Sequence, residues 1–110
     1  MLLTPTRNAR FTVGSVYSSG VTLLFGPKRT PTFFPWPVLE GVVDYLRGKD
    51  WIRVGANRDT RGNPGTLDWY LKQHVVRQTA NYVAALLAHV QVLELDDARP
   101  ARVRLRPTRA

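Results

Sequence analysis

The chain has 110 residues, 44% of them hydrophobic, which suits one small domain with its own core and argues against wholesale disorder. Sixteen Lys and Arg against eight Asp and Glu give a formal net charge of +8, and a compact domain this basic attracts polyanions, nucleic acid before anionic membrane. The absence of cysteine excludes disulfides, thiolate zinc sites and thiol catalysis. Because neither a secretory signal nor a membrane span is evident, we expect a cytoplasmic protein without a membrane partner, nucleoid-associated if it binds DNA.

The first third of the chain predicts a tail, a hairpin and a connector. Residues 1–10 are expected to fray. Residues 11–17 and 21–25 read as two short strands joined by a Ser/Gly turn, with one apolar face that needs cover. Residues 26–37 contain four prolines, which predicts an extended connector, because proline continues neither a β ladder nor a helix interior. Its aromatic residues are expected to pin it to the core; they are Phe33, Phe34 and Trp36.

The middle of the chain predicts a helix, a strand and a second helix. Pro37 suits a first helical turn, apolar residues with helical spacing follow it, and Gly48 can end the helix. Residues 51–55 read as a short strand, and a polar loop follows it. Thr66 can cap the helix over residues 66–73, where Asp68 suits the helix dipole.

The last third predicts a helix and a basic hairpin. Residues 75–90 carry one apolar face at spacings of three and four, with polar side chains at the start of the other face. Residues 92–96 read as a strand, 97–101 as a turn and 102–106 as the returning strand. In that last strand Val103 and Leu105 alternate with three arginines, which places the arginines on one face.

The order helix, strand, helix, helix, strand, strand over Pro37–Arg106 resembles the winged helix-turn-helix fold. We therefore expect an α+β chain in one domain overall. Residues 1–36 would form the tail, β-hairpin and connector packed on the core, and residues 37–110 the winged-helix domain with a short basic tail. The resemblance implies that the third helix, starting near Arg77 after a turn at Gln73–Val76, enters the DNA major groove. It also implies that the hairpin wing touches the DNA backbone or minor groove.

Residues early in the third helix are the candidate DNA-base contacts. Arg77 could bind guanine through its guanidinium fork, and Gln78 or Asn81 could pair with adenine through two hydrogen bonds. Tyr82 could bond a phosphate or touch a thymine methyl group. The alternatives are a solvated helix face for Gln78 and Asn81 and a half-buried packing role for Tyr82.

Candidate DNA-backbone contacts come from the third helix, the polar loop and the wing: Thr79, Arg58, Arg61, Arg99, Arg102, Arg104 and Arg106. The loop arginines could instead belong to a mobile surface loop. The wing arginines could protect an edge strand from aggregation. They could also pair with the acidic strand that precedes them, which carries Glu94, Asp96 and Asp97.

The leading functional expectation is a double-stranded-DNA-binding module without cofactor or metal. It would act as a small transcription regulator or as a DNA-targeting module, in which Phe33, Phe34 or Trp36 could line a pocket for a modified base. No catalytic motif or metal-ligand spacing accompanies His74 and His89, so we do not expect an enzyme.

The alternative is a protein–protein assembly module that uses the N-terminal hairpin, including a homodimer. The placement of Arg77, Arg102 and Arg104 distinguishes the two readings. One continuous positive face favours DNA, whereas acid-paired arginines beside an open apolar hairpin favour a protein partner.

Overall fold

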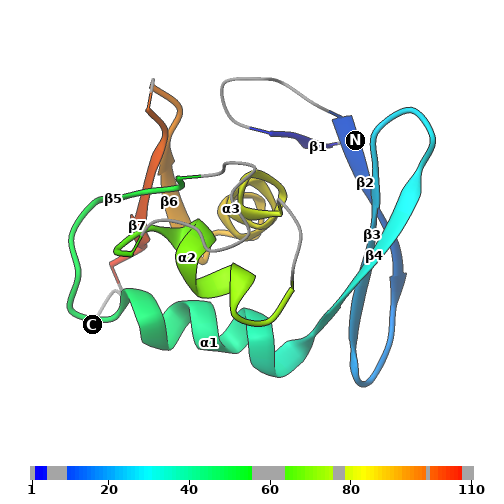
Figure 1. Ribbon diagram of the computed structural model, residues 1–110, viewed down its shortest axis with the longest axis horizontal. Coiled ribbons are helices and arrows are strands. Elements are labelled where there is room, and N and C mark those ends of the chain that lie inside the picture. The colour runs from blue at the N-terminus through cyan, green and yellow to red at the C-terminus, as the bar shows by residue number, and fades with distance from the viewer. Residues whose placement is uncertain (1, 5–9, 56–63, 76–78, 99, 108–110) are drawn as a thin grey trace.

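The computed structural model describes residues 2–4, 10–55, 64–75, 79–98 and 100–107. Its elements are, in chain order, β1 (Leu2–Leu3), β2 (Arg10–Val16), β3 (Gly20–Phe25), β4 (Thr30–Pro35), α1 (Trp36–Leu46), β5 (Ile52–Arg53), α2 (Leu67–Lys72), α3 (Ala80–His89), β6 (Leu93–Asp96) and β7 (Arg102–Leu105). The helices lie between an antiparallel sheet ordered β1-β2-β3-β4 and a smaller antiparallel sheet ordered β5-β7-β6 (Figure 1). The α+β class is confirmed.

The predicted N-terminal hairpin is confirmed as β2 and β3. The Tyr17 amide donates to the Gly20 carbonyl at 2.7 Å and closes the turn. A β-bulge at Gly14 shifts the register, so that Val13 pairs with Leu23 and Ser15 with Thr22. The prediction of a frayed tail is wrong at β1, where Leu2 pairs with Phe11 and Leu3 with Arg10. Residues 5–9 lie outside the described residues.

The prediction of an unpaired connector is wrong for residues 30–35, which form β4 against β3. Proline is tolerated here because β4 is the edge of the sheet. The Trp36 amide donates to Ser19 across the ladder, so by alternation the nitrogens of Pro31 and Pro35 face the free side, where no hydrogen bond is required.

The first two predicted helices are confirmed. α1 starts at Trp36 with Pro37 in its first turn, and Gly48 after its end takes a φ of +77°, a left-handed conformation that glycine adopts without strain. α2 begins after Thr66, whose hydroxyl accepts a hydrogen bond from the Trp69 amide at 3.1 Å.

The third helix starts later than predicted. α3 begins at Ala80 with Thr79 as its N-cap, and the Thr79 carbonyl accepts hydrogen bonds from the Tyr82 and Val83 amides. The predicted start near Arg77 is therefore wrong, because the helical hydrogen bonding begins at Thr79. Arg77 and Gln78 themselves lie outside the described residues.

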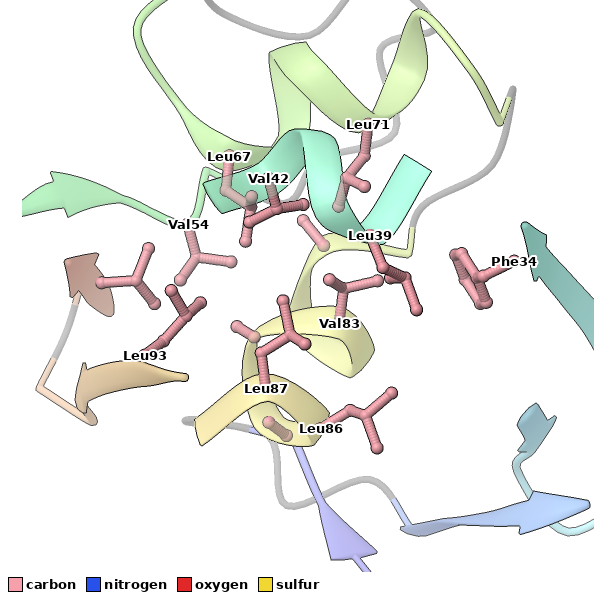
Figure 2. Close-up of a cluster of buried hydrophobic side chains, with 14 of the residues drawn as sticks. Phe34, Leu39, Val42, Val54, Leu67, Leu71, Val83, Leu86, Leu87 and Leu93 are labelled. Carbon is pink, nitrogen blue, oxygen red and sulfur yellow. The ribbon is translucent and has the colours of Figure 1, made fainter. Parts of the chain in front are cut away.

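The core surrounds α3. Figure 2 shows Val83 and Leu87 of this helix among side chains of α1 and α2, whereas Leu86 points from the side of α3 away from α1. Every residue from Val83 to Leu87 is buried, and β1 lies against the same helix. Among the described residues, no helix is long and apolar enough to cross a membrane.

The C-terminal hairpin is confirmed as β6 and β7, with Leu95 opposite Val103. β5 pairs with the other side of β7, with Ile52 opposite Val103. β7 is therefore the central strand of its sheet, so protection of an edge strand does not explain its arginines.

Candidate functional site

The face of α3 predicted to read DNA bases is covered at Tyr82. The Tyr82 ring stacks on Phe25 with centroids 3.8 Å apart and meets the edge of Phe11 at 5.3 Å. These contacts attach the N-terminal sheet to α3. This geometry favours a packing role for Tyr82. Asn81, the other predicted base contact within the described residues, is half-buried and makes no such ring contacts.

Thr79 is completely buried, so its side chain offers no surface to a phosphate and the expected backbone contact is withdrawn. Other predicted contacts, Arg58, Arg61, Arg77, Gln78 and Arg99, fall outside the described part of the chain. The expected major-groove pose needs an exposed helix in a groove about 12 Å wide. A helix with buried residues on all sides, as α3 has from Val83 to Leu87, packs inside a protein.

Two of the arginines predicted for the wing, Arg102 and Arg104, lie on the outer face of the smaller sheet and are paired with acids. Arg102 binds Asp96 at 2.5 Å, and Arg104 binds Glu94 at 3.2 Å and Asp50 at 3.4 Å. The hydrogen bond from Arg102 lowers the pKa of Asp96, and the bond to Glu94 raises the pKa of Arg104. Asp96 therefore stays ionised at neutral pH, and the three ion pairs neutralise part of the arginine row.

Trp51 supports the same two arginines from the side of β5. Its ring lies 4.5 Å from the guanidinium carbon of Arg104 and 5.5 Å from that of Arg102, within the range of cation–π attraction. Two further arginines remain exposed at this sheet: Arg53, which is paired in register with Arg102, and Arg106. Neither has an ion pair among the described residues.

The aromatic residues expected to line a modified-base pocket do not converge. Phe34 is fully buried in the core, whereas Phe33, the next residue on the same strand, points to the opposite face and is exposed. The indole nitrogen of the half-buried Trp36 donates to the Tyr17 carbonyl at 3.0 Å. Each ring therefore has a separate packing role.

Exposed apolar side chains gather at the hairpin end of the N-terminal sheet, on both of its faces. We call them the hairpin patch, which consists of Val13 (43% exposed) and Val16 (67%) on one face and Tyr17 (52%) and Phe33 (42%) on the other. The Tyr17 and Phe33 rings contact each other at 6.2 Å. The patch lies at the outer end of the sheet, near the start of α1 (Figure 1).

Sequence reasoning named the N-terminal hairpin as a possible docking element but did not identify the residues of this patch, although a signal was present. Residues 11–27 are the longest run of the chain without a charged residue. In a chain of net charge +8, an exposed segment without charge is unusual, and charge depletion marks the centre of protein interfaces.

The acidic residues around the wing do not form a metal centre. Among the described residues, no group of three or more His, Cys, Asp or Glu side chains is placed to hold a metal ion. His74 lies against the Tyr70 ring with centroids 5.0 Å apart.

Comparisons of the chain with protein-family models, curated proteins and solved structures find no match.

Proposed function

We propose that this protein is an assembly module that binds a protein partner through the hairpin patch. The observation that carries the proposal is the combination of an open apolar hairpin with wing arginines held by carboxylates. This is the arrangement that favours a protein partner over a DNA duplex. Exposed apolar side chains gathered at one end of a small domain commonly mark an interaction site.

In this proposal residues 36–107 serve as a winged helix-turn-helix scaffold. The element order supports it, as does the pairing of the single strand β5 with the second strand of the wing. The N-terminal sheet packs on α3 through Tyr82. It thereby covers part of the helix that would have to be exposed to enter a DNA groove. The same packing holds the hairpin patch at a fixed place on the molecule.

Site-specific photo-cross-linking inside the cells that naturally make the protein tests the proposed function. A benzophenone amino acid in place of Phe33 is expected to give discrete protein adducts. The same residue in place of Val90 is the control, because Val90 is also an exposed apolar residue (54%) but lies outside the patch. Absence of protein adducts at position 33, or the same adducts at both positions, would exclude the proposal.

DNA binding is the second candidate, and the distribution of charge favours it. Arg53 and Arg106 are exposed and have no ion pair among the described residues, and the chain carries a formal net charge of +8. Such cations suit sequence-independent contact with phosphates, whose strength falls as salt rises. In this reading the wing, rather than α3, lies against the duplex.

Replacing Asp96 with Asn tests the wing contact. The change frees Arg102, so duplex affinity should rise and the salt slope should steepen by about one if the wing lies on the backbone. Asp44→Asn is the matched control, since it frees Arg47 by the same change in charge away from the wing. Fluorescence anisotropy of a labelled duplex at several salt concentrations measures both. Equal effects of the two variants would indicate only the overall charge and remove the wing from the interface.

A further inference from the structure

The N-terminal sheet has two edges that differ in their capacity to accept another strand. At the β4 edge, Pro31 and Pro35 place nitrogens without hydrogen on the free side, which blocks pairing. At the other edge, β1 covers only Arg10 and Phe11 of β2. No strand among the described residues pairs with that side of β2 from Thr12 onward. Backbone groups of this stretch can therefore accept an additional strand.

The bulge at Gly14 changes which side chains border the open edge. Val13 and Val16 are three residues apart, a spacing that puts side chains on opposite faces of a regular strand. The extra residue brings them to the same face, because Val13 pairs with Leu23 and Val16 with Val21, both of which are buried. The open edge is thus bordered by two exposed β-branched side chains on one face and by Ser15 on the other.

We propose that the strand accepted at this edge is β2 of a second copy of the chain, paired antiparallel about a twofold axis. The proposal rests on the proposed function and names its partner. The open stretch Thr12–Tyr17 is free of charge, so two copies of a chain of net charge +8 can meet here without like charges facing each other.

Antiparallel pairing makes the edge complementary to itself. In this pairing Val13 of each copy lies opposite Val16 of the other copy. The two Val13–Val16 pairs are therefore equivalent, as a twofold axis requires. β1 limits the pairing to residues 12–17 of each copy. Because the prolines block the β4 edges, the joined sheet ends on both sides, and the assembly closes as a dimer instead of growing into a fibre.

Cysteine cross-linking of the purified full chain tests this geometry, because the chain has no cysteine of its own. In the proposed pairing the two Ser15 residues lie side by side, about 6 Å apart between Cα atoms. The two Ser18 residues lie seven positions out of register, about 23 Å apart. Ser15→Cys should therefore give covalent dimer with a short bis-maleimide, whereas Ser18→Cys, at a serine that is also exposed, should not. Equal yields, or more dimer from Ser18→Cys, would overturn the pairing.

Sedimentation velocity over a range of concentrations tests the dimer itself. Val16→Lys places two like charges across the open edge and should raise the dimer dissociation constant by about tenfold or more. Val90→Lys, the control with the same change outside the patch, should leave it unchanged. A wild-type chain that stays monomeric at every concentration would overturn the dimer.

A cellular photo-cross-link at Val16, which borders the open edge of β2, together with the one at Phe33, separates the failure of this inference from that of the proposed function. An adduct with twice the mass of the chain supports the dimer. An adduct only with a different protein overturns the dimer and leaves the assembly function standing. Absence of any protein adduct removes both.

Discussion

Asp68→Ala is expected to lower the free energy of unfolding by about 3–5 kcal/mol. Asp68 and Lys72 form an ion pair at 3.0 Å inside α2, with side chains that are 0% and 3% exposed. Removal of the carboxylate leaves the Lys72 ammonium group buried beside a site that no longer carries negative charge. Because stabilities of small domains are of the order of 5–15 kcal/mol, this change alone should remove much of the total.

Urea denaturation of the wild type and three variants checks this expectation. Asp44→Ala breaks an exposed ion pair with Arg47 and should cost less than about 1 kcal/mol. Replacement of both buried partners, Asp68→Leu with Lys72→Met, should recover most of the stability lost by Asp68→Ala, since no unpaired charge remains. A loss below 1 kcal/mol for Asp68→Ala would contradict the buried placement of the pair.

This ion pair illustrates what sequence reasoning could and could not find. Local signals sufficed for α1 and α2, because a proline in the first turn and the Thr66 cap act through neighbouring residues. The same reasoning placed Asp68 near a helix N-terminus, which is correct, but the helical pattern alone did not indicate that both charged partners are buried. Burial depends on which elements cover α2, and those lie elsewhere in the sequence.

The N-terminal sheet shows the same limit. β2 and β3 form a hairpin with a short turn, so their pairing could be predicted from adjacent residues. β1 and β4 could not, because Leu2 pairs with Phe11, which is not its neighbour in the sequence, and Pro31 is acceptable only at a strand whose outer side stays free. The candidate site changed for this reason: the coverage of α3 by the sheet was not visible in a helix read on its own.

Tyr82→Ala is expected to lower the free energy of unfolding by about 2–4 kcal/mol. The Tyr82 ring fills the space between α3 and the N-terminal sheet by packing on Phe25 and Phe11. Its loss leaves a cavity between the helix and the sheet. Tyr82→Phe keeps both ring contacts and should change stability by less than about 1 kcal/mol. Asn81→Ala, at the half-buried neighbouring position, should also have a small effect. Urea denaturation followed by tryptophan fluorescence measures all three.

The pair of substitutions at Tyr82 also separates the two roles considered for this residue. If the ring serves packing, Tyr82→Phe leaves duplex binding and stability unchanged, because only the hydroxyl group is lost. If the hydroxyl bonds a phosphate, Tyr82→Phe weakens duplex binding while the fold stays intact, and the major-groove pose returns to consideration. Hydrogen exchange of the β2 and β3 amides adds a second readout. Faster exchange in Tyr82→Ala, with α1 still protected, would show that this ring holds the N-terminal sheet, and with it the hairpin patch, against the helices.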